Sequence, residues 1–222
     1  MNETKLKLHD SELANNPNTR IPICIALDVS GSMDGKKIDE LNRGVNIFLK
    51  TIFEDEITRY SADIAILAFG GTVEKVLDFG AVEDIKLPKF LARGGTPMGE
   101  AVLEALDMLE DRKKQYQKNA VSYWQPWLFL ISDGAATDDI EIAAKKTCNL
   151  IENDKLELYS IPTLPGTPEE LKKFCGTTIA HVGLDYEEFF KWLSQSVAGK
   201  SKSSPGTEYK FPSPKSWSDT DW

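Results

Sequence analysis

The stretch IPICIALDVSGSMDG, residues 21–35, joins an apolar run to a polar turn and sets the kind of fold to expect. Residues 21–29 are almost continuously apolar, which is typical of a short strand buried on both faces of a parallel sheet. Three polar side chains alternate at its end, Asp28, Ser30 and Ser32, with a glycine between the two serines. The stretch therefore predicts a buried strand that delivers one carboxylate and two hydroxyls to its carboxyl end.

The rest of the chain alternates strand-like and helix-like patterns. Apolar residues recur at helical spacing in some segments and as short continuous runs in others. TVEKVLDF, residues 72–79, alternates apolar and polar residues after a Gly-Gly pair, which predicts an antiparallel hairpin partner. The alternation of strands and helices along the chain predicts an α/β fold with a doubly wound, mainly parallel sheet and helices on both faces. The expected strands are residues 21–29, 62–70, 72–79, 126–134, 155–164 and 177–184, and the expected helical segments are residues 37–53, 94–116, 138–154, 167–175 and 185–199.

Length and charge exclude several classes of protein. The chain has 222 residues, enough for one sizeable core, and a formal net charge of −9. The acidic balance argues against nucleic acid and anionic membranes as partners, because both need a cationic surface. No apolar stretch approaches the roughly 20 residues that span a bilayer, and the first twenty residues lack the apolar region of a secretory signal.

The three cysteines indicate a reducing compartment. Cys24, Cys148 and Cys175 are odd in number and widely spaced, which suits neither a disulfide framework nor a zinc site. Cys24 lies inside the first apolar run and is expected in the core. A cytoplasmic location is therefore expected.

Composition divides the chain into three parts. Residues 1–18 form a polar lead-in, residues 19–199 a single domain, and residues 200–222 a Ser/Pro-rich tail. The tail has two interpretations. It is either disordered or docks on a surface through Trp217 and Trp222.

Three predicted loops bring oxygen side chains to one edge of the sheet. Asp28 and Asp133 each follow an apolar strand, and Thr96 stands at the start of a helix in ARGGTPMGEA. Ligands of parallel α/β sheets bind at the carboxyl ends of the strands, so these residues are expected to lie together with Ser30 and Ser32. Two carboxylates and three hydroxyls suit a hard cation, Mg²⁺ first, with Mn²⁺ or Ca²⁺ as alternatives.

Three other interpretations compete with a metal site. Ser30 or Ser32 could cap the helix that follows. Asp28 could be the nucleophile of a Mg²⁺-dependent phosphoryl-transfer enzyme, although a serine at position 30 is a poor proton donor and no G-x-x-x-x-G-K-[ST] loop is present. The chain could also be a structural scaffold that needs no metal.

The site motifs resemble those of a known family. Asp28-x-Ser30-x-Ser32, Thr96 in GGTPMGEA and Asp133 in ISDG resemble the metal-ion-dependent adhesion site (MIDAS) of von Willebrand factor type A (VWA) domains, in order, spacing and context, over residues 19–198. RIPICIALDVSGSMDGKKIDELNRGV and YWQPWLFLISDGAATDD look like the bacterial tellurite-resistance TerY-like subgroup of these domains.

The resemblance implies a fold, a site and a kind of partner. It implies a Rossmann-like sheet with one short antiparallel edge strand. It also implies that Ser30, Ser32 and Thr96 ligate the metal directly, whereas Asp28 and Asp133 act directly or through water. The expected function is non-enzymatic: the metal would dock an Asp or Glu of a partner protein in a stress-response or phospho-signalling assembly, with a protein kinase or a PP2C-type phosphatase as possible members.

Overall fold

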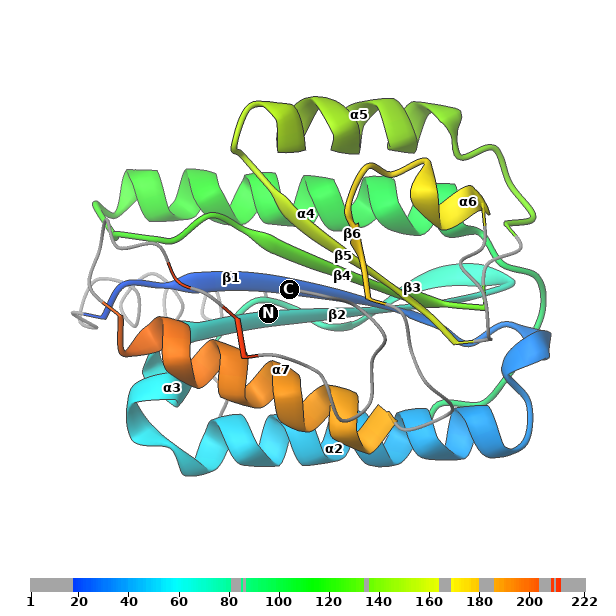
Figure 1. The fold of residues 1–222 in the computed structure, drawn as a ribbon, viewed down its shortest axis with the longest axis horizontal. Coiled ribbons are helices and arrows are strands. Elements are labelled where there is room, and N and C mark those ends of the chain that lie inside the picture. Colours follow the sequence, from blue (N-terminus) through cyan, green and yellow to red (C-terminus); the bar gives the residue numbers. More distant parts are fainter. Residues whose placement is uncertain are drawn as a thin grey trace, which may run out of the picture.

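A six-stranded sheet lies between two layers of helices in the computed structural model of the chain (Figure 1). The structure describes residues 18–80, 85, 87–133, 136–163, 169–179, 186–203, 209 and 211–212. The strands are β1 (Ile21–Asp28), β2 (Ala62–Gly70), β3 (Thr72–Leu77), β4 (Trp127–Ser132), β5 (Glu157–Pro162) and β6 (Thr177–Thr178). The helices are the short 3₁₀ turn η1 (Gly31–Met33), α2 (Lys36–Glu54), α3 (Glu56–Ser61), α4 (Met98–Lys118), α5 (Glu141–Glu152), α6 (Glu169–Lys172) and α7 (Tyr186–Ser201).

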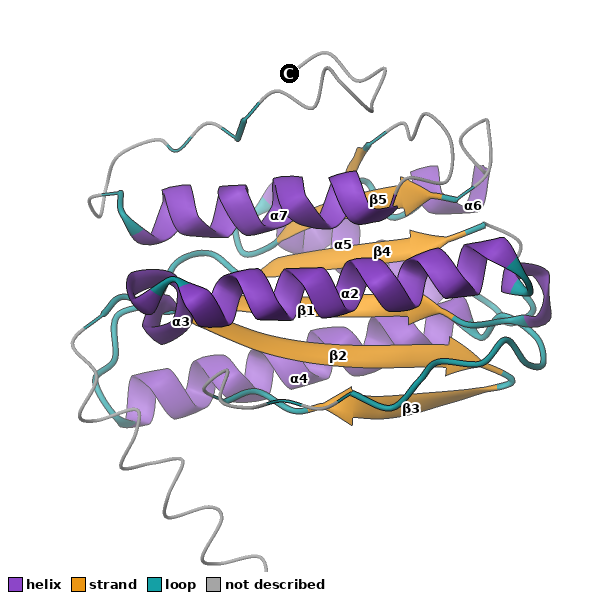
Figure 2. Cartoon of the chain, turned by 90° about the horizontal axis from the view of Figure 1, so that it is seen from below, coloured by secondary structure: helices purple, strands orange, loops and turns teal. Residues whose placement is uncertain are grey.

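The strand order confirms the predicted doubly wound α/β fold. The strands run β3-β2-β1-β4-β5-β6, and every neighbouring pair is parallel except β2 and β3. β3 is antiparallel and lies at one edge, as expected for TVEKVLDF. Figure 2 shows α2, α3 and α7 on the near face of the sheet and α4, α5 and α6 behind it.

Two cores share the central strand, because successive side chains of β1 point to opposite faces. Ile23 and Ile25 belong to the core beneath α2 and α7. Cys24 and Ala26 belong to the core beneath α4 and α5, so Cys24 is a core residue as expected. Burial on both faces explains why β1 reads as a continuous apolar run.

Helices α2 and α7 pack closely because a glycine lies between them. A Cβ at Gly44 would stand 2.6 Å from the Phe190 ring and 2.9 Å from the Tyr186 carbonyl oxygen. Any side chain there would therefore push the two helices apart. The close approach holds the middle of α2 against the first turns of α7.

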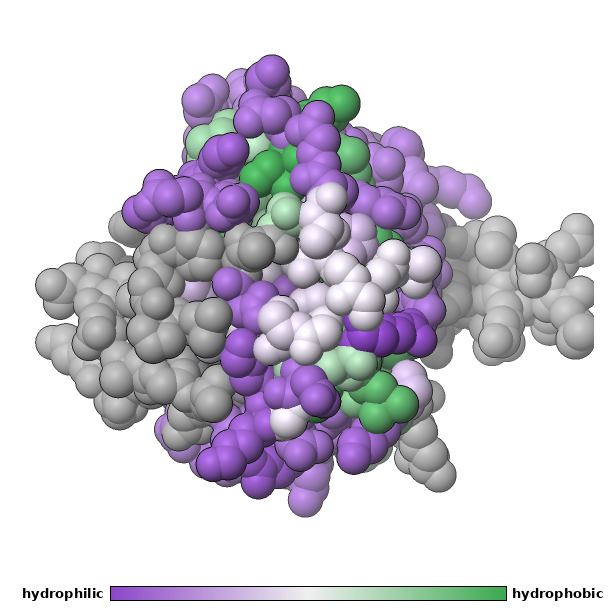
Figure 3. Space-filling model, turned by 90° about the vertical axis from the view of Figure 1, so that its right-hand side faces the viewer, coloured by the Kyte–Doolittle hydropathy of each residue, from purple (hydrophilic) through white to green (hydrophobic). Residues whose placement is uncertain are grey.

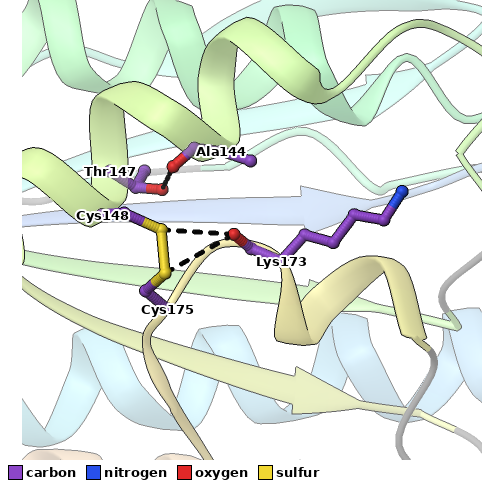
Figure 4. The surroundings of a disulfide bond; sticks show 5 residues. All are labelled: Ala144, Thr147, Cys148, Lys173 and Cys175. Carbon is purple, nitrogen blue, oxygen red and sulfur yellow. Dashed lines mark hydrogen bonds between the residues drawn. A yellow bond between two sulfur atoms is a disulfide. The ribbon is translucent and has the colours of Figure 1, made fainter.

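The prediction that the cysteines form no disulfide was wrong. Cys148 of α5 and Cys175, beyond α6, are bonded, with their Cα atoms 5.2 Å apart (Figure 4). The Lys173 carbonyl oxygen lies 3.4 and 3.7 Å from the two sulfur atoms. The bond ties α5 to the chain that leads into the edge strand β6, two segments whose proximity cannot be deduced from cysteine spacing.

Two elements differ from the predicted pattern. α3 was not predicted, although Asp55 caps it by accepting a hydrogen bond from the Thr58 amide at 2.8 Å. The last strand, expected over residues 177–184, is only two residues long in the structure, and residues 180–185 lie outside the described part. The edge of the sheet beside β5 is therefore short.

Part of the C-terminal tail packs against the domain. The Phe211 ring contacts Trp127, Tyr159 and Trp192, with ring centroids 5.0, 5.2 and 5.6 Å away. The Trp192 indole also donates a hydrogen bond to the Pro212 carbonyl at 2.7 Å. Residues 211–212 of the tail therefore contact the domain. The proposed anchors at positions 217 and 222 and the lead-in at residues 1–17 lie outside the described residues, so the docking interpretation stays a prediction.

Within the described residues, no helix combines the length and the apolar character that crossing a bilayer requires.

Candidate metal centre

Three loops meet at the carboxyl ends of β1 and β4, and backbone hydrogen bonds join them. The Gly31 amide donates to the Gly94 carbonyl at 3.0 Å, and the Arg93 amide donates to the Val29 carbonyl at 2.7 Å. The Thr137 amide donates to the Thr96 carbonyl at 2.9 Å, which ties the loop after β4 to the start of α4. The predicted site residues therefore lie on loops that are held against one another.

Asp28 ends β1 and lies completely inside the protein. Its Oδ1 accepts a hydrogen bond from the Ser30 amide at 2.8 Å, and its Oδ2 accepts one from the Ser132 hydroxyl at 2.6 Å. Burial raises the pKa of this carboxyl above its ordinary value, the hydrogen bonds from Ser132 and Ser30 oppose the rise, and the charge of Asp133 adds to it. A nearby cation would therefore stabilise the ionised carboxylate.

The two serine hydroxyls lie side by side. Ser30 is buried and Ser32 is exposed, and their Oγ atoms are 2.9 Å apart. Two neighbouring ligands of an octahedral Mg²⁺, each about 2.0–2.1 Å from the ion, are separated by about 2.9 Å. The hydroxyl pair therefore fits one edge of a magnesium coordination shell.

Asp133 forms an ion pair across the site. Its Oδ2 lies 3.1 Å from the Lys37 ammonium, which also donates a hydrogen bond to the Ser32 carbonyl at 2.9 Å. The Asp133 side chain is 5% exposed and the Lys37 side chain 17% exposed. Lys37 thus bridges the loop after β1 and the loop after β4.

Thr96 is buried and is positioned by its neighbours. Its amide donates to the Thr137 hydroxyl at 2.9 Å, which complements the backbone bond between the same two residues. Asp138 accepts from the amides of Gly99 and Glu100 at 3.1 and 2.8 Å, so it caps α4 and not its own helix. The sequence predicts a helical segment from residue 138, but α5 begins at Glu141 and Asp138 caps the neighbouring helix instead.

The capping interpretation of the two serines does not hold. The residue before α2 is Gly35, and no side chain caps that helix among the described residues. The Ser30 side chain does not cap η1 either. The hydroxyls of Ser30 and Ser32 contact each other instead, which leaves them available to a shared ligand.

Four residues of the site were missed from the sequence: Lys37, Ser132, Thr137 and Asp138. Ser132 directly precedes Asp133 in ISDG, and its hydroxyl faces Asp28 across the parallel pair of β4 and β1. Lys37 carried no signal, because a lysine at the start of an amphipathic helix is ordinarily solvated. Only the loop arrangement brings its ammonium to Asp133.

The donor set contains few carboxylates. No cluster of three or more His, Cys, Asp or Glu suited to a metal ion occurs within the described parts of the chain. Asp28 and Asp133 supply two carboxylates, and the remaining candidates are hydroxyls. Such a set fits a hard divalent cation that keeps part of its water shell and does not fit zinc.

The surface around these loops is formed largely by small residues. Figure 3 faces this edge of the sheet and shows a pale patch of intermediate hydropathy near its centre, with hydrophobic atoms above and below. The exposed residues of the loops include Gly31, Ser32, Gly71, Gly94 and Gly95. Arg93 is exposed as well and pairs with Glu74 at 2.5 Å, so its guanidinium is held toward β3.

Comparison with protein families identifies one match. The profile of the von Willebrand factor type A domain matches residues 23–135, which include β1 from its third residue, β4 and all five predicted site residues. No curated protein shows significant similarity to the sequence.

Solved structures share the fold at low sequence identity. The pilus adhesin SpaC from Lactobacillus rhamnosus GG superposes with a TM-score of 0.64 and 12% identity, over 82% of this chain and 31% of that one. The conserved hypothetical protein BatB from Bacteroides thetaiotaomicron superposes with a TM-score of 0.53 and 17% identity, over 82% of this chain and 100% of that one. Proximal thread matrix protein 1 from the mussel byssus superposes with a TM-score of 0.52 and 13% identity, over 82% of this chain and 49% of that one. The chain thus spans less than half the length of two of these three proteins.

Proposed function

Since the chain belongs to the von Willebrand factor type A domain family, we propose that it is an interaction module that docks a partner protein at a divalent-metal site of the MIDAS kind. The observation that carries the proposal is the pair of hydroxyls of Ser30 and Ser32, 2.9 Å apart, beside the carboxylates of Asp28 and Asp133. Members of this family commonly mediate contacts between proteins.

Each predicted ligand has a distinct part in the proposed site. Ser30, Ser32 and Thr96 supply neutral oxygens, whereas Asp28 and Asp133 supply the charge that offsets a divalent ion. The proposed ion is Mg²⁺, with Mn²⁺ and Ca²⁺ as alternatives. When bound, it would supply an electrophilic position for a carboxylate from an Asp or Glu of the partner, because only two ligands carry charge.

The surroundings of the site suit a protein partner. The small exposed residues of the loops allow a partner backbone to approach closely. Leu91, on the segment before Thr96, and Ile142, in the first turn of α5, are 66% and 68% exposed. Apolar side chains around a polar centre are typical of protein interaction sites.

An enzymatic role for Asp28 is less well supported, and we propose that the protein is not an enzyme. A nucleophilic carboxylate needs access to its substrate. Both oxygens of Asp28 accept hydrogen bonds inside the protein, and the residue has no exposed surface. A phosphatase assay with Mg²⁺ tests this point, since turnover that Asp28→Asn abolishes would contradict the proposal.

The biological setting is proposed from the resemblance to the TerY-like subgroup. It comprises a bacterial, cytoplasmic stress-response or phospho-signalling assembly, including tellurite resistance, with a protein kinase or a PP2C-type phosphatase as partner. The disulfide between Cys148 and Cys175 weighs against a strongly reducing compartment. The thiol state of these two residues in cells therefore tests the location.

Titration calorimetry with Mg²⁺ and Mn²⁺ tests the metal site. We expect the double variant Ser30→Ala with Ser32→Ala to bind at least about tenfold more weakly than the unmodified protein, because two ligands are lost. The matched control is Ser201→Ala with Ser203→Ala, which removes a similar serine pair at the end of α7. Equal binding by the unmodified protein and the Ser30/Ser32 variant would contradict the proposed site.

Affinity capture tests the docking step. Partner recovery from native lysate is expected to fall with EDTA and with the Ser30/Ser32 variant, and to persist with the Ser201/Ser203 control. Equal recovery in EDTA would contradict metal-dependent docking.

A further inference from the structure

The Lys37 ammonium lies among the oxygens of the proposed metal site. Lys37 is the second residue of α2, one helical turn beyond the loop that carries Ser30 and Ser32. Its Nζ is 3.1 Å from Asp133 Oδ2 and 2.9 Å from the Ser32 carbonyl oxygen. One cationic side chain of the protein thus contacts two of the five residues proposed to hold the divalent ion.

The surroundings make this contact specific. Both partners are largely buried, with 17% of the Lys37 side chain and 5% of the Asp133 side chain exposed, so solvent screens their attraction less than at the surface. Lys36, the preceding residue, is exposed and lines a groove with Asp39 and Lys89 on the outer side of α2. The sequence therefore offers two adjacent lysines, of which one is directed into the site.

A divalent ion and an ammonium cannot use the same carboxylate oxygen without cost. If Lys37 stayed in place, the two cations would repel each other across a few ångströms of poorly screened space. If Lys37 moved away, its ion pair with Asp133 and its hydrogen bond to Ser32 would be lost. Either outcome lowers the affinity for the metal.

We propose that Lys37 is a tethered cation that competes with the divalent ion for Asp133, so that metal binding is an exchange of one cation for another. This inference rests on the proposed metal site and adds its regulation. Lys37 sets the concentration range in which the metal binds. It also stabilises Asp133 at low metal concentration, when the two carboxylates would otherwise repel each other.

Calorimetric titration of Mg²⁺ and Mn²⁺ into four variants tests the exchange. Lys37→Met keeps most of the apolar stem and removes the charge, and Lys37→Gln keeps a hydrogen-bond donor without charge. Both are expected to bind the metal about tenfold more tightly than the unmodified protein, because a competing cation is gone. Lys37→Arg keeps the charge and is expected to show no such gain.

Lys36→Met is the matched control. It removes one positive charge at the neighbouring position, so it measures the effect of net charge alone, and we expect a change within about twofold. Circular dichroism and thermal unfolding in EDTA verify that each variant is folded. Lys37→Met is also expected to lower the unfolding temperature in EDTA more than Lys36→Met does.

The possible outcomes separate the two proposals. Tighter binding by Lys37→Met and Lys37→Gln, but not by Lys36→Met, supports the exchange. It is also supported if Lys37→Met and Lys37→Gln bind the metal while Lys37→Arg, Lys36→Met and the unmodified protein do not. Unchanged or weaker binding by these variants, while the unmodified protein binds, overturns the exchange and leaves the metal site standing. The exchange is also overturned if Lys36→Met raises the metal affinity as much as Lys37→Met and Lys37→Gln do. If no variant binds metal, both proposals fail.

Discussion

Asp28 is a residue whose position lowers the stability of the folded chain. Its carboxyl has no exposed surface, and burial raises its pKa above the ordinary value of 3.8. The folded state therefore binds this proton more readily than the unfolded state. The protonated carboxyl contributes its full stabilisation of the fold only below the ordinary pKa. This stabilisation is lost as pH rises through the raised pKa of the folded state. A cation bound at this site would offset the destabilisation caused by the buried, ionised carboxylate.

Replacing Asp28 with a neutral side chain measures how much its buried charge destabilises the folded protein. In EDTA at pH 7, Asp28→Asn is expected to unfold at a higher urea concentration than the unmodified protein, because Asn keeps acceptor and donor groups for Ser30 and Ser132 without a buried charge. The gain is expected to shrink as pH falls through the raised pKa of Asp28 toward the ordinary value of 3.8, because the folded state takes up this proton first. Asp34→Asn, at an exposed position nearby, is the control. A variant less stable than the unmodified protein at pH 7 would contradict this account.

At the scale of elements, the disulfide secures the edge of the sheet that has the shortest strand. It joins α5 to the chain just before β6 and closes a loop with a sequence separation of 27 residues. A disulfide that closes a loop of that length restricts the unfolded chain and so raises the free energy of unfolding by about 3 kcal/mol. Within the described residues, β6 pairs with β5 through two residues, so the disulfide is an additional link at this edge.

Reduction is therefore expected to destabilise the protein. Urea unfolding with and without dithiothreitol should differ by about 3 kcal/mol in the free energy of unfolding. The double variant Cys148→Ser with Cys175→Ser should match the reduced protein and show no further effect of dithiothreitol. An oxidised protein that is no more stable than this variant would show that the bond contributes nothing.

The elements differ in how well the sequence predicts them. The apolar runs of β1, β2 and β4 are long enough to identify buried strands, and their order fixes which loops share an edge. This is why the sequence predicts that Asp28, Ser30, Ser32, Thr96 and Asp133 share one edge of the sheet. The α3 turn is only six residues long, too short for a periodic pattern.

What the sequence did not predict depends on contacts between distant segments. The pairing of Cys148 with Cys175 requires α5 and the segment after α6 to lie side by side. The position of Lys37 requires the start of α2 to face the end of β4. Neither relation has a local signature, because both residue types are ordinary where they stand.

At the scale of the whole molecule, α4 connects the two ends of the sheet. Its first turn is capped by Asp138 beside the proposed metal site. Its last third carries Arg112 and Tyr116, which both donate to Asp63 Oδ2 at the start of β2, at 2.6 and 2.5 Å. All three residues of this second cluster are buried. Within the described residues, α4 thus contacts a polar cluster at each end of the sheet, and the cluster beside Asp138 lies at the carboxyl edge.

The two clusters are expected to act independently. Arg112→Met should lower the free energy of unfolding by about 3 kcal/mol, because Asp63 would keep a buried charge without its cationic partner. The Mg²⁺ affinity of the folded variant should not change. Lys114→Met, which removes an exposed lysine paired with Asp111, should alter stability by less than about 0.5 kcal/mol. A loss of metal affinity in Arg112→Met would show that α4 couples the two ends.

The two edges of the sheet bear on how the protein behaves at high concentration. An exposed edge strand can pair with the edge of another copy and so begin aggregation. β3 carries Glu74 and Lys75, which form ion pairs with Arg93 and Asp78 along that margin. Within the described residues, β6 offers Thr177–Thr178 at the other margin. Charge on one side and a short strand on the other therefore leave little exposed backbone for another copy to pair with.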